Sequence, residues 1–195
     1  MKMSNLPLER TGTGTAMSTA KSVLPAAQRP VVRPAGRERS ETRMPSTKRI
    51  RFTATIKAPP GVVWRHVTDP ESYRRWTSAF AEGSCFEGSW EPGARIRFLA
   101  PSGDGMVSEI AECRTNEFIS IRHLGFIANG VEDTTSEAVC AWAPAYENYT
   151  FSPTTEGTTM VVEQDVAAEW EEHLAEAWPK ALGILKELSE SRMGA

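Results

Sequence analysis

Three histidines, His66, His123 and His173, are the side chains in this sequence whose charge changes most readily near neutral pH. A metal site needs two or more His, Cys, Asp or Glu side chains that converge, often at helical spacing, and neither His66 nor His173 has such a neighbour in the sequence. His173 stands four residues after Glu169 and three before Glu176, which indicates a charge pair on the surface. The sequence therefore predicts no metal site, and no pattern in it calls for a cofactor.

His123 is the histidine whose neighbours indicate a place in a cavity. It follows Ile119 and Ile121 at alternate positions of a predicted strand, and alternate side chains of a strand share one face. If the isoleucines face the interior, His123 faces it too, where it could orient a ligand or act as a general base. The alternative is a core histidine that forms hydrogen bonds with the backbone, which is the more common situation.

Two acids and a tyrosine on late predicted strands are the other polar candidates. Glu147, Tyr149 and Phe151 share a face by alternation, and Val161 shares one with Glu163. A carboxylate buried beside apolar side chains has a raised pKa and is able to transfer protons. An unpaired Glu is seldom buried, so the sequence favours the solvent face for both acids. No nucleophile motif such as G-x-S-x-G is present.

A long helix, predicted over residues 169–191, is the element that must position these side chains. Its apolar residues recur at spacings of three and four, which places them on one stripe. Acidic residues crowd its first turns, while Lys180 and Lys186 lie in its second half, and this order suits the helix dipole. The stripe consists of Trp170, Leu174, Trp178, Ala181, Leu182, Leu185 and Leu188.

The remainder of the folded part reads as strands. Residues 48–57 alternate between apolar and polar side chains, as is typical of a half-buried strand. Prolines mark the starts of two short helices after this strand, near Pro60 and Pro70. The connection 125–135 is predicted to contain a turn at Asn129-Gly130 but no strand of its own. Further strands are predicted over residues 84–89, 94–100, 106–113, 117–124, 137–151 (interrupted near Pro144) and 158–166.

The fold class that follows is α+β. Tight turns between successive strands favour an antiparallel sheet of about six to seven strands. We expect this sheet to wrap around the long C-terminal helix and to leave room between them for a guest molecule. Of the tryptophans, Trp64 and Trp178 are predicted to pack in the core, and Trp76, Trp142 and Trp170 to lie nearer the mouth of a pocket.

The first 47 residues differ in composition from the rest. They contain no Phe, Tyr, Trp or Ile, and residues 1–48 carry nine basic against three acidic side chains. Such a segment buries too little apolar area to offset its chain entropy, so residues 1–47 are predicted to be a disordered basic tail. Because Met44 directly precedes the first strand, residues 1–43 are alternatively a mis-assigned start. The folded domain is predicted over residues 48–191.

Charge and cysteine content exclude several classes of protein. Residues 49–195 carry thirteen basic against twenty-two acidic side chains, which argues against nucleic acid as a partner. No run of about 18 apolar residues is present, so no membrane span is predicted. Cys85, Cys113 and Cys140 form no C-x-x-C pair, which indicates reduced thiols in a cytoplasmic protein. A monomer and a homodimer are both compatible with the sequence.

Short motifs follow one another in a set order through the folded part. They are Ile56-Lys-Ala-Pro-Pro60, Val63-Trp64, Thr68-Asp-Pro-Glu71, Trp76, Gly88 with Trp90 and Gly93, Gly125 with Asn129-Gly-Val-Glu-Asp133, Glu147-Asn-Tyr-Thr150, Gly157-Thr-Thr159 and Trp178-Pro-Lys-Ala-Leu182. In these motifs, over about residues 48–190, the chain resembles the helix-grip, START-like superfamily, also called SRPBCC. It is most similar to domains named after the activator of the heat-shock-protein-90 ATPase.

The resemblance implies a cavity between the long helix and the concave sheet. It implies lipid, sterol, polyketide or other apolar ligands for some members, and co-chaperone action in the stress response for the eukaryotic protein that gives the family its name. We therefore predict a non-enzymatic protein that binds a small apolar molecule. The residues predicted to bind it are Phe98, Met106, Ile110, Ile121, His123, Tyr149, Trp170, Leu174 and Trp178.

Two other functions stay open at this point. The first is a co-chaperone-like interaction module that stimulates a chaperone ATPase, which would need an exposed apolar or charged patch. The second is a small enzyme of the cyclase or dehydratase type that uses His123 or a buried Glu in the cavity.

Overall fold

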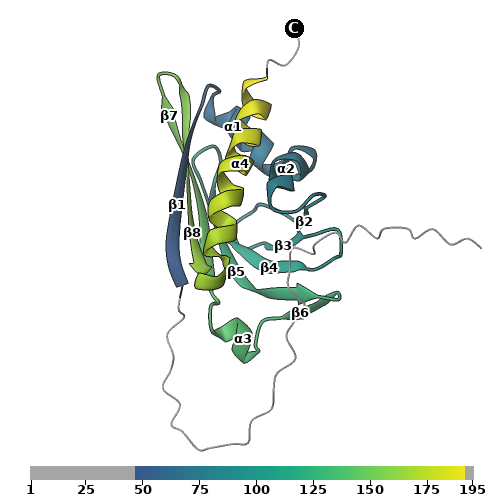
Figure 1. Ribbon diagram of the computed structural model, residues 1–195. Coiled ribbons are helices and arrows are strands. Elements are labelled where there is room, and N and C mark those ends of the chain that lie inside the picture. The colour runs from purple at the N-terminus through teal and green to yellow at the C-terminus, as the bar shows by residue number, and fades with distance from the viewer. Residues whose placement is uncertain (1–46, 192–195) are drawn as a thin grey trace, which may run out of the picture.

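An antiparallel sheet folded around one long helix makes up the protein. The structure, a computed structural model, describes residues 47–191, so residues 1–46 of the predicted tail lie outside the described residues. Figure 1 shows α4 (Glu171–Glu190) running along the sheet, with α1 (Pro60–Thr68) and α2 (Pro70–Trp76) beside it. This arrangement confirms the predicted α+β helix-grip fold.

The described part of the chain has eight strands, one more than the upper limit of the prediction. Their order across the sheet is β1-β8-β7-β5-β4-β3-β2, and β6 pairs with β5 outside this path. Every neighbouring pair is antiparallel. The strands are β1 (Thr47–Ile56), β2 (Cys85–Gly88), β3 (Arg95–Leu99), β4 (Gly105–Arg114), β5 (Phe118–Ala128), β6 (Val131–Asp133), β7 (Ala145–Thr154) and β8 (Gly157–Ala167).

The additional strand, β6, arises in the connection for which no strand was predicted. Asn129 and Gly130 both have positive φ, 51° and 74°. Two such residues form the turn whose twist matches that of the flanking strands, so a two-residue hairpin closes directly. β5 therefore continues to Ala128, and Val131 pairs back onto it. The expectation of a connection without a strand is wrong for this reason.

A second correction concerns residues 137–144, which were predicted as part of a strand. Glu137–Cys140 form a short helix, α3, and β7 begins only at Ala145. The cause is local capping, because the Ser136 hydroxyl accepts a hydrogen bond from the Val139 N–H at 3.3 Å. The Asp133 side chain in turn accepts from the Ser136 N–H at 2.9 Å. These contacts turn the chain before it enters the sheet.

The two short helices begin where the prolines predicted. α1 starts at Pro60 and α2 at Pro70. Asp69 caps α2, since its carboxylate accepts a hydrogen bond from the Ser72 N–H at 2.9 Å, and this bond lowers the pKa of Asp69. Two single turns of 3-10 helix complete the set, η1 (Thr77–Ala79) after α2 and η2 (Ala168–Trp170) before α4.

The core lies between the second half of α4 and the sheet. From Trp178 onward, all five members of the helix stripe are buried, and they share one apolar cluster with residues of the sheet such as Ile56 and Val162. The first two members, Trp170 and Leu174, are only half-buried. The apolar stripe therefore extends beyond the close-packed core at the N-terminal end of α4.

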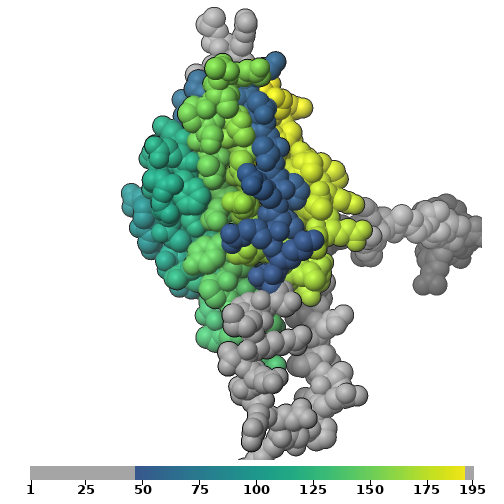
Figure 2. Space-filling view, turned by 90° about the vertical axis from the view of Figure 1, so that its left-hand side faces the viewer, coloured from purple at the N-terminus to yellow at the C-terminus, as the bar shows by residue number. Residues whose placement is uncertain are grey.

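Polar contacts fix α4 against the edge strand β1. At the C-terminal end of the helix, Lys186 donates a hydrogen bond to the Thr55 carbonyl at 2.7 Å, and Glu190 accepts one from the Lys57 N–H at 2.7 Å. At the other end, Lys48 pairs with Glu171 at 2.5 Å. Figure 2 shows β1 in blue beside the yellow helix.

Candidate functional site

A cavity of about 270 Å³ opens where the N-terminal half of α4 faces the sheet. Its volume is close to the lower end of the range of about 300–1,000 Å³ that is usual for ligand pockets. The walls consist mainly of aromatic and aliphatic side chains from α2, η1, the strands and α4. In this region the apolar stripe of the helix has no close-packed partner on the sheet. The cavity therefore lies where the stripe extends beyond the core.

Seven of the nine residues predicted to bind a ligand line this cavity. They are Phe98, Met106, His123, Tyr149, Trp170, Leu174 and Trp178. The other two, Ile110 and Ile121, lie in the apolar cluster of the core and do not line the cavity. Ligand binding by the seven stays a prediction.

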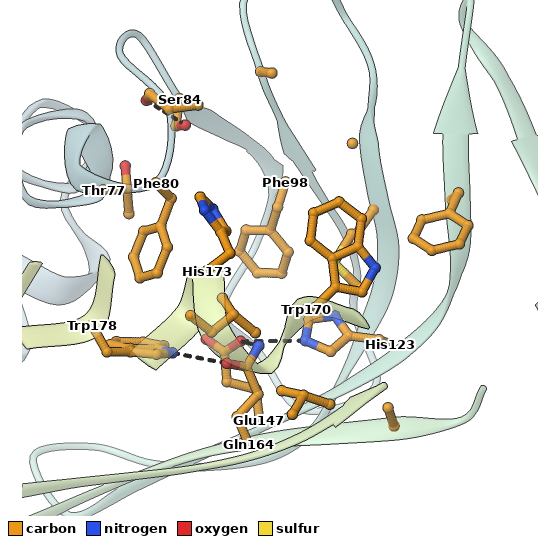
Figure 3. A pocket seen from close by; sticks show the side chains of 18 of the residues that line it. Thr77, Phe80, Ser84, Phe98, His123, Glu147, Gln164, Trp170, His173 and Trp178 are labelled. Atoms are coloured by element: carbon orange, nitrogen blue, oxygen red, sulfur yellow. Dashed lines mark hydrogen bonds and ion pairs between the residues drawn. The ribbon is translucent and has the colours of Figure 1, made fainter. Parts of the chain in front are cut away.

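A row of polar side chains follows one wall of the cavity (Figure 3). The Trp178 indole N–H donates a hydrogen bond to Gln164 Oε1 at 2.8 Å, and Gln164 Nε2 donates to Glu147 Oε2 at 2.6 Å. His123 Nε2 lies 3.5 Å from the same oxygen of Glu147. The Tyr149 hydroxyl donates to the other oxygen, Oε1. The Glu147 carboxylate is thus the point on which the row converges.

Glu147 corrects the expectation that both late acids face solvent. Its side chain is only 12% exposed, and it lines the cavity. The expectation assumed an unpaired carboxylate, whereas the hydrogen bonds from Tyr149 and Gln164 offset part of the cost of burying it. Glu163 lies on the opposite face of β8 from Gln164 and does not line the cavity, as predicted.

His123 is 3% exposed and has a polar neighbour on each side of its ring. Nδ1 lies 2.8 Å from the hydroxyl oxygen of Ser108, and Nε2 faces Glu147. The Ser108 hydroxyl is able either to donate to Nδ1 or to accept from it, so the tautomer decides which of the two groups is the donor. The distance of 3.5 Å from Nε2 to Glu147 is too long for a strong hydrogen bond, so Nε2 has no full partner.

Ser108, His123 and Glu147 lie next to one another in space, but they do not form a nucleophilic triad. Ser108 is fully buried and does not line the cavity, so its hydroxyl cannot reach a guest molecule. It holds the imidazole in place instead. The predicted alternative of a core histidine bound to the backbone is also wrong in its partner, since Nδ1 pairs with a side chain.

The other two histidines take no part in this row. His66 Nδ1 pairs with the Ser72 hydroxyl at 2.9 Å, away from the cavity. His173 is exposed and contributes to the cavity lining, with its ring 6.2 Å from that of Trp170. Within residues 47–191 no ion pair joins it to Glu169 or Glu176, so the predicted charge pair is not formed.

Two phenols in the cavity stay protonated. Burial raises the pKa of Tyr149 well above its usual value, and the nearby Glu147 carboxylate raises it further. The same two causes, in the same order, raise the pKa of Tyr73. Tyr149 is therefore a hydroxyl donor to Glu147 throughout the neutral range, and neither phenol adds a charge to the cavity.

Asp165, at the rim of the cavity, is already paired. Arg49 donates to its two oxygens at 2.8 and 3.0 Å, and the Tyr146 N–H donates at 3.1 Å. Burial acts to raise the pKa of Asp165, but the bonds from Arg49 and Tyr146 together outweigh it and lower the pKa. The stability that this pair contributes is present above the unfolded-state pKa of an Asp and is lost as the pH falls through the lower, folded-state value.

Some residues that line the cavity were predicted near it from the sequence, and others were not. Trp76, Trp142 and Trp170 all line the cavity, but Trp76 is 1% exposed and belongs to the core, so its predicted place near the mouth is wrong. Gln164 had a usable signal, because alternation along β8 puts it on the buried face between Val162 and Val166. Phe80, just after η1, had none, because its place depends on how α2 meets α4.

Residues 47–191 contain no group of three or more His, Cys, Asp or Glu side chains arranged to hold a metal ion. None of their helices combines the length and the apolar content needed to cross a bilayer.

A family model matches most of the described part of the chain. The model of the family described as activator of Hsp90 ATPase homolog 1-like protein matches residues 57–190. No curated protein is similar enough to this chain to count as a match.

Solved structures share the fold. Protein MLL2253 from Mesorhizobium loti has a TM-score of 0.57 and 20% identity, and the match covers 76% of this chain and all of that one. The Aha1 dimer from Colwellia psychrerythraea has a TM-score of 0.57 and 17% identity, with coverage of 75% and 99%. CalU16 from Micromonospora echinospora has a TM-score of 0.52 and 18% identity, with coverage of 75% and 79%. At these identities the likeness establishes the fold alone.

Proposed function

The chain belongs to the family of activator of Hsp90 ATPase homolog 1-like proteins, and from this premise we propose that it binds a small hydrophobic molecule beneath α4 without catalysing a reaction. The observation that carries the proposal is the cavity of about 270 Å³, with aromatic and aliphatic walls and one row of polar groups. Ligand pockets have this composition, in which apolar walls supply affinity and a few polar groups set orientation.

The two parts of the cavity would contribute differently to binding. Apolar area removed from water stabilises a complex by about 25 cal/mol per Å², before the costs of association are subtracted. The row of polar side chains sets the orientation of the ligand, because Glu147 and His123 lie at one wall and the remaining walls offer few polar partners. A ligand with one polar end would therefore bind in a single orientation.

Leu174→Arg tests the site. Leu174 is half-buried on α4 and lines the cavity, so an arginine there would place a charge and a long side chain in it. We expect the neutral fluorescent probe N-phenyl-1-naphthylamine to bind the wild-type protein at one molecule per chain and to show no saturable binding to this variant. Fluorescence titration measures the binding, and circular dichroism checks that the variant is folded.

Ala175→Arg is the matched control. Ala175 is the next residue on the same helix, is exposed and does not line the cavity. It adds the same charge without entering the site, so the probe should bind as it does to the wild type. A wild-type protein that does not bind the probe, or a Leu174→Arg variant that binds it normally, would contradict the proposal.

An enzyme of the cyclase or dehydratase type is the second candidate. The observation in its favour is that His123, which is buried, and Glu147, whose side chain is 12% exposed, both line the cavity, as a proton-transferring pair would. The test is to extract any molecule that co-purifies with the protein and to incubate it with fresh protein. Mass spectrometry and chromatography that recover it unchanged would eliminate this candidate, and loss of a water or a new retention time would favour it.

No structural observation favours the co-chaperone alternative in the same way. Among residues 47–191, Val131 is the only large hydrophobic residue that is exposed, at 68%, and a single residue is not an apolar docking patch. Stimulation of a chaperone ATPase, a cytoplasmic location and the choice between monomer and homodimer stay predictions from the sequence.

A further inference from the structure

We propose that the ligand of the cavity is a cation, namely a small ammonium ion that carries an aromatic or alkyl group. This inference rests on the binding function proposed above and specifies the class of ligand. Three features of the cavity carry it: the sign of its charges, the lack of a fixed cationic partner for Glu147, and the aromatic rings that form its walls.

The ionisable groups of the cavity are mostly acidic. Among the described residues that line it, none is Lys or Arg, whereas four are Asp or Glu. Asp165 is balanced by Arg49, and Asp104 and Glu169 belong to the outer part of the lining. Glu147 is the acid that lies deep in the cavity, with its side chain 12% exposed.

The partners of Glu147 solvate its charge without cancelling it. Tyr149 and Gln164 are neutral donors, and the high pKa of Tyr149 keeps its proton in place. His123, the remaining neighbour, has Nε2 3.5 Å from Glu147 Oε2, which is too far for a strong hydrogen bond. A buried carboxylate of this kind is costly unless a cation pairs with it, and attraction between opposite charges is stronger in the cavity than in water.

The walls supply the second attraction. A cation is drawn to the face of an aromatic ring within about 6 Å of its centre, most strongly to Trp. The cavity is lined by Trp76, Trp142, Trp170 and Trp178 as well as by several phenyl and phenol rings. In Figure 3 the rings of Phe80, Phe98 and Trp170 lie across from the row that runs from Trp178 to His123. An ammonium group between these two sides would meet both the carboxylate and ring faces.

Two molecules of the same shape and different charge test the proposal. Benzyltrimethylammonium and neopentylbenzene differ only in the central atom, which is a charged nitrogen in the first and a carbon in the second. We expect isothermal titration calorimetry on the full chain to give a dissociation constant at least about tenfold lower for the ammonium ion. Glu147→Gln keeps the shape of the side chain and removes its charge, so this preference should disappear or reverse.

Glu163→Gln is the matched control. It removes the same charge from a residue on the face of β8 that does not line the cavity. The preference should persist in this variant, and Leu174→Arg should abolish binding of the ammonium ion. If neopentylbenzene binds the wild-type protein as tightly as the ammonium ion does, the cation proposal is wrong and the hydrophobic-ligand function stands. If neither molecule binds but N-phenyl-1-naphthylamine does, the cation proposal alone is wrong, and if none of the three binds, both proposals are wrong. The wild-type comparison decides between these outcomes even if Glu147→Gln fails to fold.

Discussion

Replacement of Trp178 by alanine is expected to lower the free energy of unfolding by about 3–5 kcal/mol, the range found for large aromatic side chains removed from a core. Trp178 is 2% exposed, and its ring centre lies 4.9 Å from that of Phe80 and 6.2 Å from that of Trp76. Its loss would leave a void at the inner end of the cavity and would deprive Gln164 Oε1 of its donor. Urea denaturation followed by circular dichroism measures the change.

Two further substitutions serve as comparisons for Trp178→Ala. Trp178→Phe keeps a ring but loses the indole N–H, so it should cost less than the alanine variant and more than zero. Trp170→Ala removes the same side chain from a half-buried position at the N-terminal end of the stripe, where it should cost about 1 kcal/mol or less. Equal losses for Trp170→Ala and Trp178→Ala would contradict a core that ends between these two positions.

Gly157→Ala is expected to destabilise the protein by about 3 kcal/mol through backbone strain and a steric clash. Gly157 begins β8 with φ of +141°, a conformation that side chains other than glycine rarely adopt. A Cβ added there would lie 2.2 Å from the Ile56 carbonyl oxygen and 2.7 Å from the Ala58 nitrogen. Both are backbone atoms at the end of β1, so neither can move aside cheaply. Thermal unfolding of the variant measures the loss.

Gly183→Ala makes the same chemical change where the backbone permits it. Gly183 lies on the exposed side of α4, and a Cβ there would have no atom within 4 Å. Alanine in a helix is favoured over glycine by about 0.5–1 kcal/mol, so this variant should be slightly more stable than the wild type. A Gly157→Ala protein that melts at or above the wild-type temperature would show that the close approach to β1 does not constrain the fold.

The elements with repeated local signals could be predicted from the sequence. The apolar stripe and the proline starts of α1 and α2 each indicate a helix within a few residues, and all three helices are present. The first stripe residue, Trp170, lies in η2, because α4 begins at Glu171 and not at residue 169. β6 and α3 were missed although Asn129-Gly130 and Ser136 are local signals of a hairpin and a helix cap. β6 has three residues and α3 has four, and such short segments show no periodic pattern that would identify a strand or a helix.

The candidate site was predictable only where it depends on alternation. His123 was placed by its spacing from Ile119 and Ile121, and it reaches the cavity. The burial of Glu147 could not be deduced, because it depends on a hydrogen bond to Gln164 on the neighbouring strand, seventeen residues away. Ile110 and Ile121 are buried together with residues that line the cavity. Which buried residues line it depends on the position of α4 over the sheet, and the sequence does not specify that position.

The contacts of β1 and α4 also determine when the chain is able to fold during its synthesis. The first described strand pairs with β8, more than a hundred residues later, and α4 follows β8. Until α4 has left the ribosome, the rings of Trp76, Phe80 and Tyr149 lack the Trp178 ring that packs against all three. A nascent chain therefore holds an uncovered aromatic surface until its last helix emerges, and a polypeptide terminated before residue 171 would retain that surface and be prone to aggregate.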